Sequence, residues 1–169
     1  GRQQTVSQEL LNSVPTGSTP QSYAVLLPSV TQGLGVISTA PFLWPSRDYL
    51  VYVPKGHSAW KRAPLLVLCH GCKQTPEEFA QGTRVVDMAD RQGCIVLLPR
   101  QKDTANPWRC WNWFEPRTMH GHGEAAIVAA QIRSVSRRYR IDGKRVLVAG
   151  MSAGGAMAAV MGVRFPGLV

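Results

Sequence analysis

Ser152 is the residue whose surroundings most clearly predict chemistry, because it lies between two glycines in the stretch Gly-Met-Ser-Ala-Gly at 150–154. A largely apolar run at 145–149 precedes this stretch, and small residues of helical character follow it at 154–163. Between a strand and a helix, such a serine stands on a sharp turn with its hydroxyl exposed, and the glycines let strand and helix approach. The pattern predicts a nucleophilic serine, with the Ala153 N–H at the helix start able to stabilise an oxyanion.

A second motif, His-Gly-Cys-Lys-Gln at 70–74, follows the apolar run 65–69. In hydrolases with a serine in this context, the loop after an earlier central strand contributes another N–H to the oxyanion site. We therefore predict that the Cys72 N–H is the second oxyanion donor. For His70 there are two interpretations, a general base or a structural histidine that orients the loop. Its place before the serine and beside the oxyanion site favours the structural role.

An aromatic run, Trp-Asn-Trp-Phe at 111–114, lies in a long irregular stretch from Arg100 to Gly123. Open α/β sheets bind ligands at the carboxyl ends of their strands, so this loop would wall an apolar acyl or polymer site. We predict Trp111 and Trp113 as substrate-binding residues. Because the two residues alternate along the chain, only one of them would face the substrate. A packed loop core is the alternative, and the sequence leaves it open.

His120, His122 and Glu124, with Glu115 nearby, have the residue types of a metal site. The glycines between them make the segment a flexible lead into a helix, and Glu124 would favour the positive N-terminus of that helix. Because no completing ligand is evident, we predict no metal here and no cofactor for the chain.

Apolar runs alternate with segments of helical periodicity from residue 47 onward. Strands are predicted at 49–53, 65–69, 94–98 and 145–149, and helices at 77–91, 124–139 and 154–163. Thr75 caps the first helix, Pro76 occupies its first turn and Gly93 closes it. This alternation predicts an α/β fold, with a mostly parallel sheet and helices on both faces.

Length and composition predict one domain. The chain has 169 residues, of which 44% are hydrophobic, and this is enough for one sizeable core. Residues 1–45 are rich in Ser, Thr, Gln, Pro and Gly, and we expect an irregular leader there, with the domain over 46–169. No apolar run approaches the length of a membrane span, so no membrane span is predicted.

The net charge of +9 raises the question of a polyanionic partner. The densest basic stretch, from Arg133 to Arg145, interleaves arginines with Val135 and Tyr139 at helical spacing. We interpret it as the solvated face of an amphipathic helix. Because no zinc-finger, RNP or basic-zipper pattern accompanies it, we predict no nucleic-acid partner.

The four cysteines allow two disulfides at most, or four thiols. Cys69 and Cys94 lie within apolar runs, where a free cysteine behaves as a small hydrophobe. Cys72 and Cys110 lie in loop-like segments, and a bond between them would mean folding in an oxidising compartment.

Taken together, several motifs resemble the poly(3-hydroxybutyrate) depolymerase family of esterases, from about residue 47 to the end of the chain. The motifs are Arg-Asp-Tyr at 47–49, Val-Pro at 53–54, Leu-Cys-His-Gly-Cys-Lys-Gln-Thr at 68–75, Cys-Trp-Asn-Trp-Phe at 110–114, Gly-Glu at 123–124 and Gly-Met-Ser-Ala-Gly-Gly-Ala-Met at 150–157. They occur in the order found in the family, so the resemblance does not rest on the serine motif alone.

The resemblance implies an α/β-hydrolase fold, a Ser-Asp-His triad and hydrolysis of carboxylic esters through an acyl-enzyme on Ser152. It also implies export, so that the protein would be secreted or periplasmic, and a disulfide between Cys72 and Cys110. The implied substrate is either a polyester oligomer or a small or polysaccharide-linked ester, and we favour a general esterase.

The triad of this fold is incomplete in the chain. Its order is Ser, then Asp or Glu, then His, yet none of the 17 residues after Ser152 is Asp, Glu or His. We expect 46–169 to be the N-terminal, nucleophile-bearing part of one α/β-hydrolase domain, with acid and base supplied elsewhere, for example by a second polypeptide. The alternative is a truncated, non-catalytic relative that acts as a binding protein.

Overall fold

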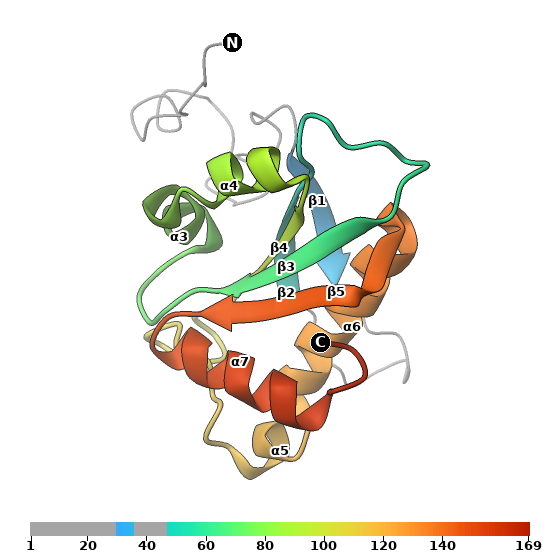
Figure 1. Ribbon diagram of the computed structural model, residues 1–169. Helices are drawn as coiled ribbons and strands as arrows, with labels where there is room; N and C mark the ends of the chain where they lie inside the picture. The colour runs from blue at the N-terminus through green and yellow to red at the C-terminus, as the bar shows by residue number, and fades with distance from the viewer. Residues whose placement is uncertain (1–29, 36–46) are drawn as a thin grey trace.

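A single mixed sheet organises the residues that the computed structural model describes, which are 30–35 and 47–169 (Figure 1). In this part of the chain the sheet has five strands in the order β1-β2-β4-β3-β5. The strands are β1 (Val30–Gly35), β2 (Arg47–Tyr52), β3 (Ala63–Cys69), β4 (Ile95–Pro99) and β5 (Ile141–Gly150). The helices are α3 (Pro76–Thr83), α4 (Val85–Gln92), α5 (Pro116–Met119), α6 (Gly123–Tyr139) and α7 (Ala153–Arg164).

The parallel part of the sheet is the part that carries the predicted motifs. Strand β3 pairs in parallel with β4 on one side, where Val67 is opposite Leu97, and with β5 on the other, where Val67 is opposite Val148. Strand β2 is antiparallel to β4, and β1 is antiparallel to β2. Because β3, β4 and β5 are parallel, the loops that follow them all lie at the same end of the strands, the carboxyl end.

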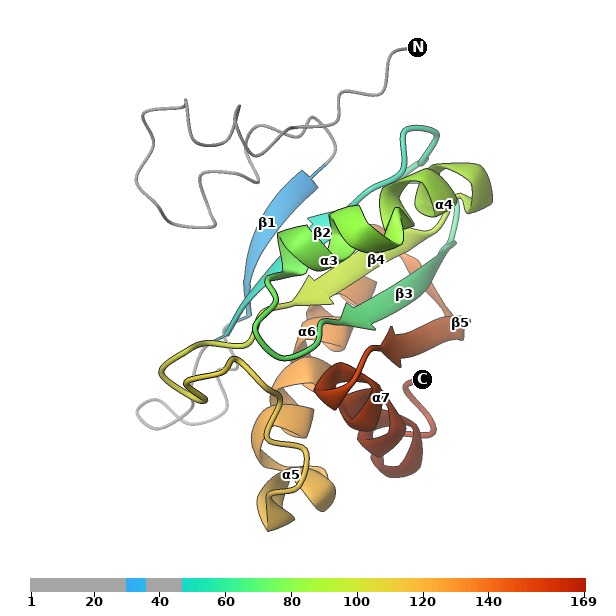
Figure 2. The same ribbon diagram turned by 90° about the vertical axis from the view of Figure 1, so that its left-hand side faces the viewer.

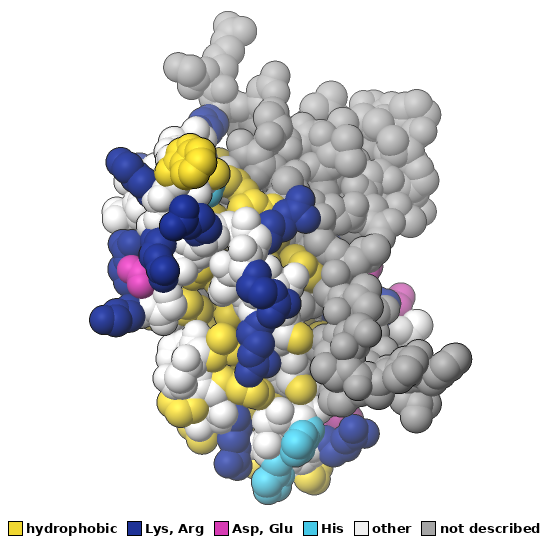
Figure 3. Space-filling model, turned by 90° about the vertical axis from the view of Figure 1, so that its right-hand side faces the viewer, with side chains coloured by type: hydrophobic (Ala, Val, Ile, Leu, Met, Phe, Trp, Pro, Cys, Tyr) yellow, Lys and Arg dark blue, Asp and Glu magenta, His cyan; other side chains and the backbone are white. Residues whose placement is uncertain are grey.

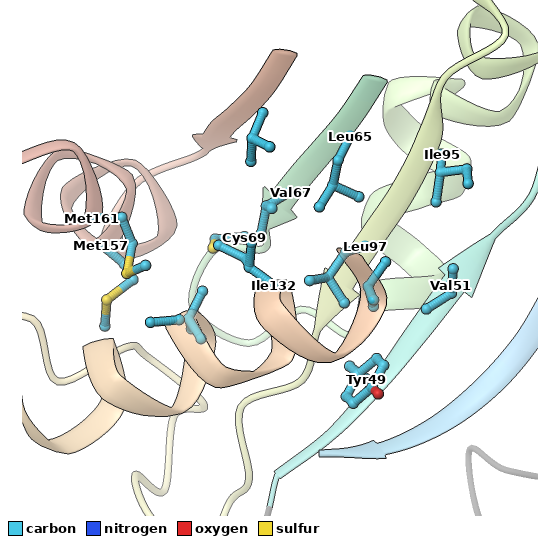
Figure 4. Packing of buried hydrophobic residues seen from close by; sticks show 14 of the residues in the cluster. Tyr49, Val51, Leu65, Val67, Cys69, Ile95, Leu97, Ile132, Met157 and Met161 are labelled. Carbon is cyan, nitrogen blue, oxygen red and sulfur yellow. The ribbon is translucent and has the colours of Figure 1, made fainter. Parts of the chain in front are cut away.

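Helices cover both faces of the sheet, as the alternation of elements predicts (Figure 2). The apolar runs of β3 and β4 are buried on both sides because their side chains alternate between two hydrophobic clusters. Leu65 and Val67 face the cluster that includes α6 and α7, whereas Leu68 faces the cluster that includes Phe79 of α3. Figure 4 shows Ile132 of α6 and two methionines of α7 directed at the strands.

The prediction of one continuous helix at 77–91 is wrong, because two helices occupy this range. The start agrees with the sequence: Thr75 caps α3 and forms a capping box with Glu78. Arg84, however, has a φ of 52° and a ψ of 33°, which ends α3, and α4 begins directly after it. The Thr83 hydroxyl donates to the Phe79 carbonyl at 2.7 Å in this last turn. Propensity alone does not reveal such a break.

The expectation of an irregular leader over 1–45 is wrong for residues 30–35, which form β1 at the edge of the sheet. The short stretch has no strong alternation, so its pairing with β2 depends on the neighbouring strand rather than on its own pattern. The rest of 1–45 lies outside the described residues.

At the other edge of the sheet, the described part of the chain leaves one face of β5 uncovered. Val146 points into the core and is 7% exposed, whereas the next residue, Leu147, is 69% exposed. Val163 on α7 is likewise 71% exposed. Within the described residues, no helix is both long and apolar enough to cross a membrane.

Candidate active site

Ser152 lies on the turn between β5 and α7, where its backbone has a φ of 55° and a ψ of −123°. A positive φ is uncommon for a residue with a Cβ, and such a conformation persists only where the surrounding structure holds it. Ser152 is exposed, whereas Ala153 after it is buried. The turn therefore brings the serine out to the surface at the carboxyl edge of the parallel strands.

Two glycines make this turn sterically possible. A Cβ on Gly150 or on Gly154 would come closer than 3.0 Å to the carbonyl oxygen of Cys69, a separation that real Cβ atoms essentially never show. The Met151 N–H also donates to the Cys69 oxygen, at 3.3 Å. The end of β3 and the start of α7 are thus in backbone contact, which explains why both flanking positions are glycine.

The Cys69 thiol, although close to this turn, is not a competing nucleophile. Its residue is fully buried, and burial raises the pKa of the thiol to about 12. The thiolate is the reactive form of cysteine, so this thiol is inert at neutral pH. Cys69 and Cys94 are both free and buried, which confirms their interpretation as small core residues.

The two predicted oxyanion donors lie on neighbouring segments. Ala153 is the first residue of α7, so its N–H has no partner within the helix. The loop that contains Cys72 packs against the serine turn, since a Cβ on Gly71 would lie 3.4 Å from the Met151 carbonyl oxygen. Among the described residues, neither the Ala153 nor the Cys72 N–H donates to another backbone oxygen. Their role at an oxyanion stays a prediction.

The loop after β3 is fixed covalently to the aromatic loop. Cys72 and Cys110 form a disulfide, which confirms the pairing that the family resemblance implies. Next to it, the Lys73 N–H donates to the Trp108 carbonyl at 2.7 Å, and the Lys73 ammonium lies 4.4 Å from the centre of the Trp108 ring. The position of the Cys72 N–H therefore depends on residues about forty positions further along the chain.

His70 is a structural residue rather than a base. It is fully buried, its Nδ1–H donates to the Gly71 carbonyl at 2.8 Å, and its Nε2 accepts the Gln101 N–H at 3.1 Å. Because a carbonyl only accepts and an amide N–H only donates, the ring is neutral with its proton on Nδ1. Burial is the main cause that lowers the pKa of His70. The ring joins the end of β3 to the end of β4, in agreement with the structural interpretation.

Trp111 and Trp113 lie in opposite environments. Trp111 is 1% exposed and its indole N–H donates to the His70 carbonyl at 3.1 Å, so the prediction that it binds substrate is wrong. The loop turns its ring inward, where the N–H satisfies a buried backbone oxygen. Trp113 is 39% exposed and meets the more exposed Phe114 edge to face, with ring centres 5.9 Å apart. Trp113 stays the predicted substrate contact.

A buried polar network that the sequence did not reveal holds the aromatic loop in place. Its centre is the carboxylate of Glu124 on α6, which is 6% exposed. This carboxylate accepts hydrogen bonds from the Asn112 backbone N–H at 2.7 Å, from Asn112 Nδ2 at 3.0 Å and from Gln101 Nε2 at 2.5 Å. The Arg47 guanidinium lies 3.7 Å from it and donates to Gln101 Oε1. Strands β2 and β4, the aromatic loop and α6 therefore meet at one carboxylate.

Arg47, Asn112 and Glu124 each lie in a motif of the family resemblance, but nothing in the sequence indicates that these separate motifs meet. Glu124 is thus engaged with loop residues rather than with His120 or His122, both of which are exposed. The His120 Nδ1–H donates to the Pro116 carbonyl at 2.6 Å. Over the described ranges, no group of three or more His, Cys, Asp or Glu residues is arranged to hold a metal ion.

The described residues contain a strained serine turn and its predicted oxyanion donors, but no histidine among them hydrogen-bonds to the Ser152 hydroxyl. His70, the histidine of the neighbouring loop, uses both ring nitrogens elsewhere.

Comparison with known proteins gives a consistent picture. A family model described as "Esterase PHB depolymerase" matches residues 47–169. The chain is 36% identical over 117 residues to poly(3-hydroxyalkanoate) depolymerase C of Paucimonas lemoignei, a match that covers 68% of this chain and 27% of that protein. It is 34% identical over 104 residues to feruloyl esterase B of Neurospora crassa, covering 60% of this chain and 35% of that protein.

The fold comparison agrees with the sequence comparison. An acetyl xylan esterase from Aspergillus awamori superposes with a TM-score of 0.71 at 22% identity, over 83% of this chain and 48% of that one. The chain has the α/β-hydrolase fold and spans less than half the length of each of these three relatives. Because the family model covers most of its residues, the chain belongs to the Esterase PHB depolymerase family.

Proposed function

We propose that the protein is a serine hydrolase of carboxylic esters and that Ser152 is its nucleophile. The observation that carries the proposal is the backbone of Ser152, held at a φ of 55° between glycines that cannot accept a Cβ. Such strain is retained where it serves a site, and here it exposes a hydroxyl at the carboxyl edge of a parallel sheet. Membership of a family whose named relatives include a depolymerase and a feruloyl esterase supports the same chemistry.

In the proposed reaction, Ser152 Oγ attacks the ester carbonyl carbon while its proton passes to a base. The Cys72 and Ala153 N–H groups hold the negative oxygen of the tetrahedral intermediate, and one such donor contributes roughly 100-fold or more in rate. The intermediate collapses to an acyl-enzyme, and the alcohol leaves with a proton returned by the base. Water then cleaves the acyl-enzyme to release the acid and restore Ser152.

The base and its orienting acid are proposed to belong to polypeptide that packs against the uncovered side of β5. Leu147, 69% exposed on the uncovered face of β5, and Val163, 71% exposed on α7, are apolar side chains that further polypeptide could cover. This chain matches only 27% of the depolymerase and 48% of the acetyl xylan esterase, so these longer relatives have room for such a segment. Whether that polypeptide is continuous with this chain or a second one does not change the chemistry that Ser152 requires.

The proposed substrate is an ester with an apolar or aromatic acyl part or a polymeric backbone. Trp113 and Phe114 support this choice, since both are exposed on the loop that is tied to Cys72 through the disulfide. Exposed aromatic rings give a ligand a large apolar contact area. Replacement of Trp113 by alanine should raise KM for an aryl or long-chain ester more than for an acetate ester.

Secretion to the periplasm or beyond the cell is proposed from the Cys72–Cys110 disulfide, because such bonds persist in oxidising compartments. Mass spectrometry of protein made under oxidising conditions should find these two cysteines joined and the other two as thiols. Four free thiols in that sample would contradict the proposed compartment.

The direct experiment is labelling of the natural protein, with any polypeptide that copurifies, by a fluorophosphonate probe that reacts with activated serines. Peptide mapping should find the probe on Ser152, and the label should disappear in Ser152→Ala and in heat-unfolded protein. Ser134 on α6, away from the serine turn, provides the control, because Ser134→Ala should label normally.

Absence of label in a folded sample would overturn the esterase proposal and favour a non-catalytic relative that keeps the fold for binding. The 169-residue chain by itself should label slowly and turn over esters poorly, because Ser152 then lacks a base. Brisk turnover by that chain alone would contradict the proposed origin of the base.

A further inference from the structure

The surface at the amino-terminal end of the parallel strands carries a dense group of exposed cations (Figure 3). We call it the basic face. It combines the segment before β3, the second half of α6 and its cap, and the first half of β5. Its members are Lys61, Arg62, Arg133, Arg137, Arg138, Arg140, Lys144 and Arg145.

Backbone and side-chain contacts bring these three segments together. The Ala63 N–H donates to the Arg140 carbonyl at 3.3 Å, which joins the start of β3 to the end of α6. The Arg145 guanidinium donates to the Arg62 carbonyl at 3.4 Å, which joins β5 to the same segment. The sequence shows the basic stretch from Arg133 to Arg145, whereas the structure adds Lys61 and Arg62 beside it.

Acidic side chains are sparse on this face. Among the described residues, Asp142 is the one carboxylate that pairs with its cations, through Arg145 Nε at 2.7 Å. The helix dipole favours Arg137 and Arg138 in the last turn of α6. It does not account for the lysines and arginines before β3 and in β5. Arg133 and Arg137 are like charges four residues apart, a spacing that destabilises a helix.

The geometry also leaves this face independent of the candidate active site. Ser152 follows the carboxyl end of β5, whereas the basic face is at the opposite end of the same strand. A long polymer bound there would not cover the serine. Trp60, adjacent in sequence to Lys61, is 85% exposed and offers a flat apolar surface next to the charges.

We propose that the basic face binds an acidic polysaccharide, a chain of uronic acid units. Guanidinium groups pair with carboxylates in a forked geometry, and the indole of Trp60 can lie against a sugar ring. The Cys72–Cys110 disulfide favours this polyanion over a nucleic acid, because it implies an oxidising compartment outside the cytoplasm. The binding does not depend on the proposed esterase activity.

The test is the affinity of the natural protein, with any copurifying polypeptide, for polygalacturonate at low salt, with neutral dextran as the comparison polymer. The variant Lys61→Gln/Arg137→Gln/Lys144→Gln removes one cation from each segment of the basic face. Its affinity should fall about tenfold or more, and its dependence on salt should become shallower, because fewer counterions are released.

A control variant with the same loss of charge is Arg84→Gln/Lys102→Gln/Arg117→Gln, whose cations lie outside the basic face. It should bind polygalacturonate within about twofold of the wild type, and both variants should keep a cooperative thermal transition. Equal losses in the two variants would mean that net charge alone attracts the polymer and would overturn the proposal.

Two further outcomes would also overturn it. One is the absence of binding to polygalacturonate at low salt. The other is tighter binding to duplex DNA or to anionic lipid vesicles than to polygalacturonate at matched charge concentration, which would assign the surface to a different class of polyanion. Loss of labelling by the fluorophosphonate probe has no bearing on these measurements, so the two proposals fail separately.

Discussion

The conformation of Ser152 depends on atoms that are absent as much as on atoms that are present. Gly150 and Gly154 allow β3 to approach the start of α7, and a Cβ at either position would collide with the Cys69 carbonyl. The same helix contains Gly162, which is exposed and has no atom within 4 Å of an added Cβ. Gly154 and Gly162 share a helix and differ in their surroundings, so substitutions at these two positions can be compared directly.

Gly154→Ala should destabilise the protein by about 1–3 kcal/mol, because the turn must open to admit the methyl group. Probe labelling of Ser152 should fall with it. Gly162→Ala should instead stabilise by about 0.5–1 kcal/mol, since alanine is the better helix residue. Denaturant unfolding of both variants checks this, and equal effects would contradict a steric origin for the turn.

His70 makes the stability of the loop sensitive to acid. Its pKa is lowered, chiefly by burial, from an ordinary value of 6.5. The neutral ring therefore stabilises the fold above that pH, and the contribution is lost as the pH falls below it. Protonation would place a hydrogen on Nε2, where the Gln101 N–H must donate.

We expect the free energy of unfolding to fall between pH 7 and pH 5 in the wild type, and to fall less in His70→Asn. The variant should be less stable at pH 7 because its shorter side chain cannot join both strand ends. Urea unfolding at several pH values measures both effects. An unchanged slope in the variant would assign the acid sensitivity to other groups.

At the scale of elements, two features hold the loops of the site in position, the Glu124 network and the Cys72–Cys110 disulfide. Glu124 links α6 to Asn112, and Trp111 next to it donates to the His70 carbonyl. The path from α6 to the loop that carries Cys72 is therefore a chain of hydrogen bonds between buried groups.

Glu124→Gln should lower the free energy of unfolding by about 3 kcal/mol. The substitution removes the carboxylate that faces the buried Arg47 guanidinium, and it places an amide N–H₂ opposite groups that themselves donate hydrogen bonds. Glu115 is also on this loop, is exposed and makes no side-chain cap for α5, so Glu115→Gln should be nearly neutral. Thermal unfolding compares the two variants. A small effect at Glu124 would mean that water or rearrangement satisfies the network.

At the scale of the whole molecule, the uncovered face and edge of β5 determine how the chain associates with other chains. In the described part of the sheet, β5 pairs with β3 alone, and Leu147 and Ala149 are exposed on one of its faces. An open strand edge with apolar side chains is prone to pair with other chains.

We therefore expect the isolated 169-residue chain to self-associate with rising concentration, and Leu147→Lys to reduce the association. Met119→Lys, a similar change on α5 at 45% exposure, should leave it unaltered. Sedimentation velocity at several concentrations measures this. Association that persists equally in both variants would locate the contact elsewhere.

The sequence predicted the parts of this fold that depend on local pattern. Apolar runs marked β3, β4 and β5, the capping residues marked the start of α3, and the glycines around Ser152 marked the turn. These features follow from backbone geometry and side-chain periodicity within a short window. The resemblance to a family added the Cys72–Cys110 bond.

Tertiary structure decided what depends on residues far apart in the chain. The pairing of β1 and the inward turn of Trp111 each depend on neighbours that a local window does not contain. The same is true of the Glu124 carboxylate, whose partners come from three other segments. It is also true of the basic face, whose cations come from three segments of the chain. Local pattern fixes which element a residue joins, whereas its contacts are set by how the elements pack.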